Sequence, residues 1–296
     1  MLVCVDNGYD STKVRTVNRL FQFESKFEKA NDNVLDKDIL EYQGEKWINK
    51  GQDDIENNKT KSLIHKLCTL KALGELTENK EEFDLIIDLP LTHYQNKEFR
   101  EQFKEYISSP KRSYFKYKGK LKETIINKCI VVPQALASLY SENPQLYKGK
   151  VVGIIDVGGL TIDGCIVKDL KPIKSSIFTV NLGTTILENR MKTALNEKYF
   201  LNIQDYEMDG ILKNGILGKE KLSKDFMLHI YDEHFSGLLR EMRAKNWSLE
   251  TLEIKGIGGG LIKFENMITK FLPNLQSSEN PVFENVNGLF NIGRMM

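Results

Sequence analysis

Apolar positions along the chain fall into two kinds of spacing, which indicate strands and helices in turn. Short runs rich in valine, isoleucine and leucine favour strands in the first half of the chain. These runs are residues 2–6, 13–17, 83–89 and 124–132, with weaker signals at 21–27 and 41–48. Apolar residues three and four positions apart predict one-faced helices. Such helices are expected at residues 62–76, 96–107 and, as a short element, 134–140.

The second half of the chain shows the same alternation. Strands are expected at residues 150–155, 163–168, 175–180 and 252–257, and helices at 188–199, 221–245 and 262–271. Residues 276–281 are polar and predict a surface loop. A unit of strand, polar acidic turn and strand occurs at Asp6 and again about 150 residues later at Asp156. Such a repeat predicts an α/β protein built from two related domains.

Composition restricts the possible functions. The chain has 296 residues, of which 42 are basic and 41 acidic, and its formal net charge is +1. This balance disfavours direct binding of nucleic acid, which needs a basic surface. Apolar runs stay far below the roughly 20 residues of a membrane helix, and the N-terminus lacks the basic start and apolar stretch of a signal peptide. We therefore expect a soluble cytoplasmic protein with no membrane partner.

The cysteines and histidines predict no metal or redox centre. The cysteines Cys4, Cys68, Cys129 and Cys165 are isolated along the chain, and no pair has the two-residue spacing of a zinc or redox site. Small buried thiols in a reducing compartment explain them. The histidines form no ligand pattern either.

The turn after the first predicted strand is a candidate anion site. Its residues include Asp6, Asn7, Gly8, Ser11, Thr12 and Lys13. A glycine allows a tight turn whose backbone amides can cradle an anion, and the hydroxyl groups and the lysine add donors. Asp6, at the end of the strand, is placed to hold a magnesium ion through water. The alternative is a solvated hairpin turn, for which these residue types are also common.

The second acidic turn repeats this arrangement. Its candidate residues are Asp156, Gly158, Gly159, Leu160 and Thr161. The paired glycines allow the backbone to approach a phosphate closely, and Asp156 would offer a second carboxylate to the same metal. A glycine hairpin without a ligand is the alternative. The matched pair of turns, one per domain, favours a nucleotide held in a cleft.

Two further segments carry candidate chemistry. Gln134 follows Pro133 and is expected to begin a helix. A glutamine in such a place can orient a water molecule towards a terminal phosphate, and the alternative is a polar residue near a helix N-terminus. Gly258, Gly259 and Gly260 follow a predicted strand and precede a predicted helix. They would allow close approach of a flat ligand such as a purine, although this pattern is common.

These segments occur in the order found in the actin and heat-shock-chaperone ATPase superfamily. They most resemble the ParM/StbA-type bacterial actins that segregate plasmids. The resemblance rests on residues 6–13, 133–140, 156–163 and 258–260, with 181–185 and 283–289, and it spans residues 2–293. It implies an α/β, actin-like fold, a duplicated ribonuclease H-like fold of two domains with a nucleotide cleft.

The resemblance also implies domain boundaries. Domain I would comprise residues 1–150 and the returning segment 276–296, with subdomain IB at about 20–80. Domain II would comprise residues 151–275. Subdomain IIB would be reduced, because only residues 202–217 are available where larger members place a full subdomain.

Roles for individual residues follow from the resemblance alone. The implied catalytic residues are Gln134 and Asp156. The implied metal residues are Asp6 and Asp156, acting through water, and Asp163, whose alternative role is that of a solvent-facing strand residue. Gly183 and the turn and glycine residues named above would contact the nucleotide. The implied cofactors are ATP, with GTP as the alternative base, and Mg²⁺.

The function implied is that of an actin-like ATPase whose nucleotide-dependent filaments segregate plasmid DNA. Its partners would be further copies of itself and a separate basic adaptor protein that binds the DNA. One alternative is a small-molecule kinase on the same fold, although Asp53 and Asp54 look like a solvated surface rather than a substrate pocket. The others are a chaperone or non-hydrolysing scaffold, and a cell-shape or division actin.

Overall fold

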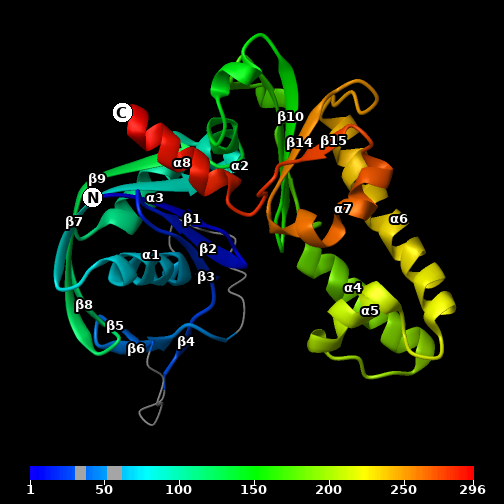
Figure 1. Ribbon diagram of the computed structural model, residues 1–296, viewed down its shortest axis with the longest axis horizontal. Helices are drawn as coiled ribbons and strands as arrows, with labels where there is room; N and C mark the ends of the chain where they lie inside the picture. The colour runs from blue at the N-terminus through cyan, green and yellow to red at the C-terminus, as the bar shows by residue number, and fades with distance from the viewer. Residues whose placement is uncertain (31–37, 52–61) are drawn as a thin grey trace. The chain divides into compact units, whose positions relative to one another are not determined.

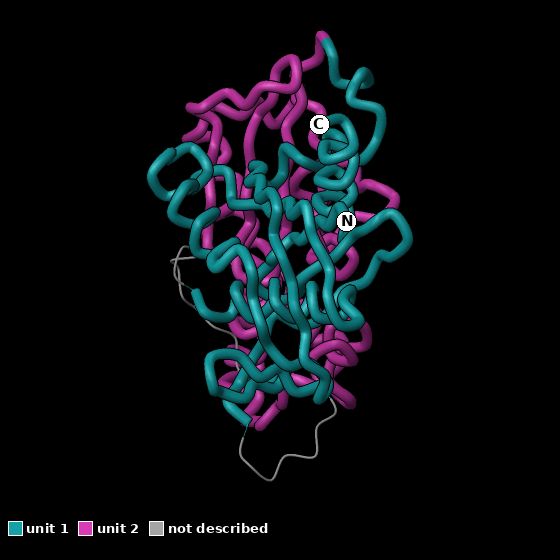
Figure 2. Tube along the Cα trace, turned by 90° about the vertical axis from the view of Figure 1, so that its left-hand side faces the viewer, with its two compact units in different colours: residues 1–148, 282–296 teal, residues 149–281 magenta. Residues whose placement is uncertain are grey.

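The chain folds into two α/β units. The computed structural model describes residues 1–30, 38–51 and 62–296. Unit 1 comprises residues 1–148 and 282–296, and unit 2 comprises residues 149–281 (Figure 2). Asp53 and Asp54 lie outside the described residues. Within the part of the chain that is described, no helix combines the length and the apolar character needed to span a bilayer.

The central sheet of unit 1 joins three parallel strands to an antiparallel hairpin. Its strands are β1 (Leu2–Asn7), β2 (Ser11–Arg15), β3 (Leu20–Glu24), β7 (Lys80–Leu89) and β9 (Lys120–Pro133). They lie in the order β3-β2-β1-β7-β9, with β1, β7 and β9 parallel and with β2 and β3 antiparallel to their neighbours. The carboxyl ends of β1, β7 and β9 therefore meet at one end of the sheet.

Beyond β9 the sheet of unit 1 continues through four shorter strands. They are β8 (Arg112–Tyr117), β5 (Leu40–Tyr42), β6 (Glu45–Ile48) and β4 (Glu28–Lys29), each antiparallel to its neighbour. Buried Ser113, Phe115 and Tyr117 alternate with exposed residues along β8. This part of the sheet packs on one helix face through a separate apolar cluster that contains Leu40, Leu67 and Phe115.

Helices cover both faces of the central sheet (Figure 1). They are α1 (Leu63–Leu76), α2 (Leu91–Tyr94), α3 (Lys97–Ser108) and α8 (Glu284–Met295), with the 3₁₀ helices η1 (Leu136–Tyr140) and η2 (Pro144–Tyr147). Successive side chains of a strand point to opposite faces. Val3 and Val5 accordingly join an apolar cluster with α1 and α3, whereas Cys4 joins one with α8. The alternation puts Asp6 on the same face as Cys4.

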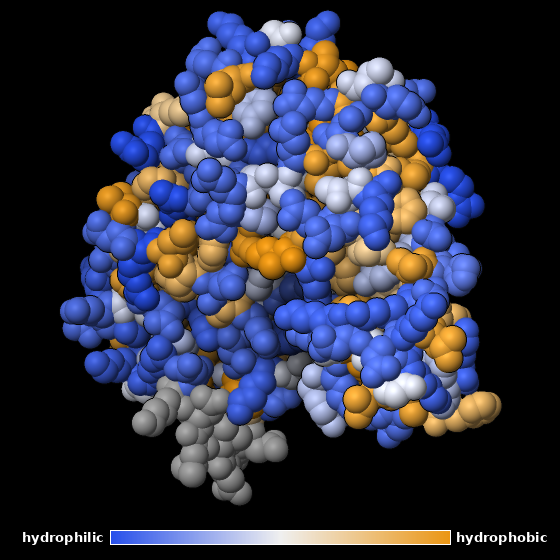
Figure 3. All heavy atoms as spheres, turned by 45° about the vertical axis from the view of Figure 1, so that its right-hand side comes forward, coloured by the Kyte–Doolittle hydropathy of each residue, from blue (hydrophilic) through white to orange (hydrophobic). Residues whose placement is uncertain are grey.

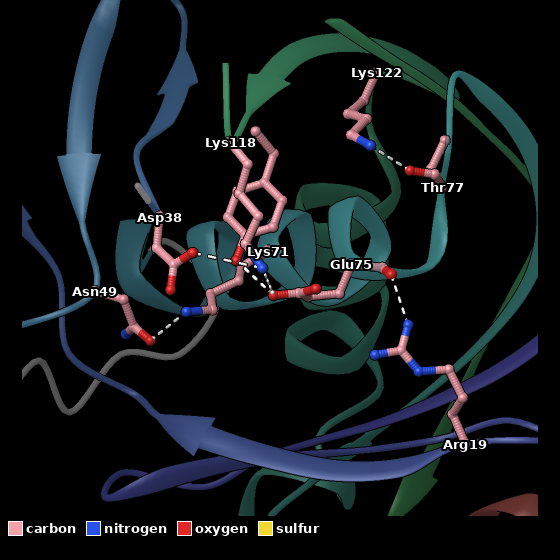
Figure 4. Close-up of polar contacts among 9 residues, drawn as sticks. Arg19, Asp38, Asn49, Lys71, Glu75, Thr77, Lys118 and Lys122 are labelled. Carbon is pink, nitrogen blue, oxygen red and sulfur yellow. Dashed lines mark hydrogen bonds and ion pairs between the residues drawn. The ribbon is translucent and has the colours of Figure 1, made fainter. Parts of the chain in front are cut away.

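A polar cluster attaches the end of α1 to the turn between β8 and β9 (Figure 4). The Tyr117 hydroxyl donates to Glu75 Oε1 at 2.7 Å, and Lys118 Nζ lies 2.8 Å from the same oxygen. Lys118 Nζ also pairs with Asp38 at 3.5 Å, and Arg19 donates to the Glu75 carbonyl oxygen at 2.7 Å. The other contacts in this view join Lys71 to Asn49 and Lys122 to the backbone of Thr77. Glu75 is therefore the acceptor that several donors share.

Unit 2 repeats the strand order of unit 1. Its strands are β10 (Val151–Val157), β11 (Ile162–Lys168), β12 (Lys171–Pro172), β13 (Phe178–Val180), β14 (Ile254–Ile257) and β15 (Leu275–Ser277). They lie in the order β12-β11-β10-β14-β15, with β13 also pairing β11. The strands β10, β14 and β15 are parallel, and β11 is antiparallel to β10. The predicted duplication within an α/β fold is confirmed.

The helices of unit 2 are α4 (Thr184–Tyr199), α5 (Met208–Asn214), α6 (Glu220–Ala244) and α7 (Gly259–Phe271), with the 3₁₀ helices η3 (Lys174–Ser176) and η4 (Asp205–Glu207). Met191, Phe235 and Leu261 from three of these helices are almost fully buried in the core of the unit. Between α4 and α6, residues 202–217 form η4 and the short α5. The segment therefore contains two short helices in the place of a full subdomain, as expected for a reduced subdomain IIB.

Several elements differ from the sequence expectations. The helices α5 and α8 are not among the predicted helices, and η3 occupies the start of the strand predicted at 175–180. The helix predicted at residues 134–140 is the 3₁₀ helix η1, which begins at Leu136. Residues 275–277 form β15, although 276–281 are predicted as loop. The strand β8 is missing from the predicted elements. Both strands are fixed by pairing with partners distant in sequence, β14 for β15 and β9 for β8, and so short a run carries little local signal.

The shared acceptor Glu75 should matter more than an exposed ion pair of the same unit. Glu75→Ala should lower the free energy of unfolding by about 1–3 kcal/mol, because the buried Tyr117 hydroxyl loses an acceptor. The control Glu41→Ala removes the exposed pair with Lys116, 3.0 Å apart, and should cost about 0–1 kcal/mol. Urea unfolding measures both, and equal effects of the two substitutions would contradict the assignment.

The effect of Glu75→Ala should depend on pH. Burial raises the pKa of Glu75, but hydrogen bonds from Lys118 and Tyr117 outweigh burial and hold the pKa below its usual value. A carboxyl whose pKa is lower in the folded state stabilises fully above its unfolded-state pKa of about 4.3. The difference between wild type and Glu75→Ala should thus shrink as the pH falls through the lower folded-state pKa. A difference that grows on acidification would contradict this.

Candidate functional site

The hairpin of β1 and β2 presents a buried carboxylate beside a tight turn. Asp6 stands opposite Lys13 in the strand register, and Asp6 is only 2% exposed. Its Oδ1 atom has no hydrogen-bond partner among the described residues. A Cβ on Gly8 would lie 2.8 Å from the Ser11 carbonyl oxygen and 3.3 Å from Lys13 Nζ. The turn therefore needs glycine, and it brings an amine close to its backbone.

Two further predicted ligands of this turn, Asn7 and Thr12, have partners within the protein. Asn7 Nδ2 donates to Thr69 Oγ1 at 3.2 Å. The Thr12 hydroxyl donates to Asn7 Oδ1 at 3.3 Å and lies 2.8 Å from the Ser25 hydroxyl. These buried side chains hold the hairpin in place. Ser11 and Lys13 are half-buried, so they are the side chains of the turn better placed to meet a ligand.

The hairpin of β10 and β11 repeats the arrangement in unit 2. Asp156 is 7% exposed and stands opposite Asp163. The Gly158 N–H donates to the Thr161 carbonyl oxygen at 2.9 Å and closes the turn. Asp163 accepts from the hydroxyl groups of Thr161 at 2.9 Å and Thr179 at 2.5 Å. In this arrangement the carboxylate of Asp163 ties the turn to β13.

The turn that leads into α4 lies directly on this second hairpin turn. The N–H groups of Gly183, Thr184 and Thr185 donate to the carbonyl oxygens of Leu160, Gly158 and Gly159 at 3.0, 3.0 and 2.8 Å. A Cβ on Gly183 would lie only 2.2 Å from the Gly159 carbonyl oxygen. The first turn of α4 therefore fixes the shape of the loop at residues 158–160, and only glycine allows this approach.

His234, which the sequence patterns do not single out, supports the same turn from α6. Its Nε2 atom lies 2.8 Å from the Leu182 carbonyl oxygen, one residue before Gly183. Burial lowers the pKa of His234, so the ring stays neutral near pH 7. The contact links α6 to the segment that shapes the second hairpin turn.

The three glycines before α7 have two different structural roles. Gly258 has φ +95°, and a Cβ there would lie 2.5 Å from Asp156 Oδ1. A Cβ on Gly260 would lie 2.6 Å from Val157 Cγ1. Among the described residues, no atom lies within 4 Å of a Cβ built on Gly259. Two of the glycines thus allow the chain to pack beside Asp156, and the middle one faces open space.

Gly259 lines a cavity of about 710 Å³ formed by α5, α6 and α7. Its apolar lining includes Met227, Tyr231, Phe264 and Met267, and its polar lining includes Asp209, Lys213 and Lys263. Lys263 forms ion pairs with Asp209 at 2.5 Å and with Glu188. Burial lowers the pKa of Lys263, but the hydrogen bonds that its ammonium donates to Asp209 and Glu188 outweigh burial and raise the pKa. Volume and lining are those of a small-molecule site.

Gln134 precedes a strained turn instead of beginning a helix. Its carbonyl oxygen accepts from the Leu136 N–H at 2.8 Å, and Ala135 between them has φ 66° and ψ −52°. This is a γ-turn with positive φ, and a non-glycine residue in such a conformation costs about 1–3 kcal/mol. The Gln134 N–H donates to the Leu89 carbonyl oxygen at 2.8 Å. Gln134 therefore lies at the carboxyl end of the parallel strands, as Asp6 does.

Asp88 is a further acidic residue at this end of the sheet. It is 2% exposed and follows Ile87, which stands opposite Val5 in the register of β1 and β7. The near-continuous apolar run at residues 83–89 predicts a strand but does not single out Asp88. The signal that could have identified Asp88 is an acidic residue just before the end of an apolar strand.

The donor set suits a metal ion held mainly by water. Within the described residues, no group of three or more histidine, cysteine, aspartate and glutamate side chains could hold a metal ion. Asp6 and Asp156 each offer one buried carboxylate in its own unit. Magnesium keeps several of its waters and binds through one or two carboxylates. The unpaired Oδ1 of Asp6 fits such a hydrated ion.

The contact between Gly183 and the second hairpin turn can be tested by substitution. Gly183→Ala should lower the melting temperature and increase amide hydrogen exchange at residues 158–161, because the new Cβ overlaps the Gly159 carbonyl. In the control Gly210→Ala, no described atom lies within 4 Å of the Cβ, and helix propensity should raise stability by about 0.5–1 kcal/mol. Unchanged exchange in Gly183→Ala would contradict the role given to this turn.

Comparisons with known proteins agree with this geometry. Residues 4–136 match the family model described as "Actin like proteins N terminal domain". The chain resembles Ta0583, an archaeal actin homologue, in its complex with ADP, with a TM-score of 0.80 and 17% identity over 100% of this chain and 99% of that one. It also resembles a ParM filament protein from Clostridium botulinum, with a TM-score of 0.76 and 19% identity over 100% and 99% of the two chains.

A third similar structure is apo pSK41 ParM, with a TM-score of 0.73 and 16% identity over 99% of this chain and 97% of that one. Among curated proteins no relative matches. The family match covers most of unit 1, and the structural likeness extends over both units with their repeated strand order. The chain has an actin-like two-domain fold, the fold of the archaeal actin homologue and of the ParM proteins that it resembles.

Proposed function

We propose that this protein is a nucleotide-dependent, filament-forming ATPase that segregates plasmid DNA. The observation that carries the proposal is the duplicated hairpin, in which a buried aspartate precedes a tight glycine turn in each unit. The similar proteins support it, since one is an actin homologue in complex with ADP and another forms a 15-stranded filament. ATP is the proposed nucleotide, with GTP as the alternative.

In this proposal both hairpins contribute to one nucleotide site. The phosphates would lie against the turn at Gly8 and Lys13 and against the turn at residues 158–161. Asp6 and Asp156 would hold Mg²⁺ through water, and the metal would supply positive charge to the phosphate oxygens. The nucleoside would occupy the 710 Å³ cavity beside Gly259, whose apolar and polar lining suits a base and a ribose.

Hydrolysis requires a group that orients water towards the terminal phosphate. Gln134 is suited to this role, since it is half-buried and lies at the same end of the sheet as Asp6. Its amide can both donate and accept hydrogen bonds. Asp156 would contribute to the same step by holding the metal ion through water. Such a site works by position and charge, which suits a slow hydrolysis that times filament disassembly.

Self-association is supported by exposed apolar side chains that lie from the end of α4 to the first turn of α6. Phe200 is 94% exposed, Tyr206 84%, Leu217 93% and Leu222 64%. In Figure 3, exposed apolar side chains are scattered among hydrophilic ones on the face in view. Exposed apolar surface of this kind is suited to an interaction, and a second copy of this chain is the proposed partner. With a net charge of +1, the protein would reach DNA through a basic adaptor.

Asp156→Ala should abolish the rise in light scattering that nucleotide and magnesium produce in the wild type. The substitution removes the carboxylate that faces the metal, while Asp232→Ala removes an exposed charge on α6 of the same unit and should assemble normally. Assembly of Asp156→Ala at the wild-type nucleotide concentration would contradict the proposed site.

Gln134→Ala should still assemble with nucleotide but release phosphate about 100-fold more slowly, the usual cost of losing a group that positions a reactant. Its filaments should therefore disassemble slowly. A phosphate assay beside light scattering measures both steps. Release at the wild-type rate would show that Gln134 does not orient the water.

Gly259→Leu tests whether the cavity holds the nucleoside. The new side chain would enter open space, so the protein should keep its melting temperature while nucleotide affinity falls at least about tenfold through lost burial of the base. Titration calorimetry with ATP and with GTP measures the affinity. Unchanged affinity in the folded variant would exclude the cavity as the nucleoside site.

A further inference from the structure

The strained turn after Gln134 is held by a residue from the C-terminal helix. Asn285 Oδ1 accepts a hydrogen bond from the Ala135 N–H at 3.1 Å, and Asn285 is 5% exposed. The Ala135 carbonyl oxygen accepts from the Ser138 N–H at 3.1 Å and from its hydroxyl at 2.6 Å. Both backbone groups of Ala135 are thus satisfied, and the partner of its N–H comes from α8.

Helix α8 is fixed against this segment along its length. A Cβ on Gly288 would lie 1.7 Å from the Ala137 carbonyl oxygen, so the backbones of α8 and η1 are in direct contact. Ser141 donates to Glu284 at one end of the contact, and Asn291 Nδ2 donates to the Tyr140 carbonyl oxygen at 2.7 Å at the other. The position of the Asn285 amide is therefore set by packing and not by its own flexibility.

The conformation of Ala135 determines the direction in which the chain leaves Gln134. A positive φ at a residue with a Cβ is unfavourable and persists only when neighbouring groups enforce it. Without the Asn285 acceptor, the buried Ala135 N–H would lose its partner, and the turn would relax towards an ordinary conformation. Gln134 would then be displaced relative to the end of the parallel strands.

We propose that Asn285 is a positioning residue for hydrolysis, which holds the γ-turn at Ala135 and thereby aims the Gln134 side chain at the attacking water. This inference rests on the proposed role of Gln134. It adds a function for the C-terminal helix, whose Asn285 accepts a hydrogen bond from the Ala135 N–H. It also accounts for an unfavourable backbone conformation next to a candidate catalytic residue.

The test compares Asn285→Ala with Asn287→Ala. Asn287 lies on the same helix, and its Oδ1 accepts from Arg15 Nη1, so its loss weakens the docking of α8 without touching the turn. Asn285→Ala should slow phosphate release about 10- to 100-fold, the usual cost of misplacing a reacting group, with nucleotide affinity within about threefold of wild type. Asn287→Ala should retain wild-type release. Equal slowing by both variants would assign a purely structural role to Asn285.

Asn285→Asp keeps an acceptor at the same position and should restore release to near the wild-type rate. If Asn285→Ala does not fold, this variant still tests the proposal, because slow release by a folded Asn285→Asp with intact nucleotide affinity would overturn it.

A double-substitution cycle shows whether Asn285 acts through Gln134. Adding Asn285→Ala to Gln134→Ala should produce no further slowing, because the two substitutions remove the same step. Additive slowing would overturn the inference and leave the proposed function intact. If the wild type releases no phosphate from ATP or GTP, the proposed function fails, and this inference fails with it.

Discussion

A carboxylate at the buried end of a parallel strand is the constraint on which the rest of this structure depends. Asp6 and Asp156 occupy that position in their own units, and both are nearly inaccessible to water. A buried carboxylate oxygen without a hydrogen bond costs about 1–3 kcal/mol, which a cation or a ligand donor can offset. The unpaired Oδ1 of Asp6 therefore points to a binding function more directly than any glycine pattern does.

Most glycines near Asp156 are needed for close packing within the protein. Gly183, Gly258 and Gly260 are sites where any side chain would overlap neighbouring atoms of unit 2. They bring the ends of α4 and α7 onto the loop that follows Asp156. Gly259 alone among them opens onto the cavity. A glycine-rich segment near a phosphate-binding turn can thus owe most of its composition to internal packing.

Local patterns predict the repeated hairpins, the parallel strands other than β15 and most of the longer helices, because these elements carry their periodicity within a few residues. The strands β8 and β15 were not predicted, since pairing with distant strands defines them. Residue types and spacing name the candidate site residues, and their roles stay predictions. The internal partners of Asn7, Thr12 and Asp163 were not predicted, because Ser25, Thr69 and Thr179 belong to other elements.

The turn at Ala135 shows most clearly that local patterns do not reveal contacts with distant elements. Pro133 and Gln134 suggest the start of a helix, whereas the chain forms a γ-turn that Asn285 supports from 150 residues away. Asp88 and His234 were overlooked for related reasons. The first interrupts an otherwise apolar run, and the second acts on a backbone carbonyl that no motif identifies.

The most direct measurement is a crystal structure of the protein with Mg²⁺ and a non-hydrolysable ATP analogue. If both hairpins contribute to one nucleotide site, we expect one metal ion whose bound waters contact both Asp6 and Asp156. The phosphates should lie against both glycine turns. A structure in which the analogue binds elsewhere, or in which only one of the two aspartates approaches the metal, would contradict this expectation.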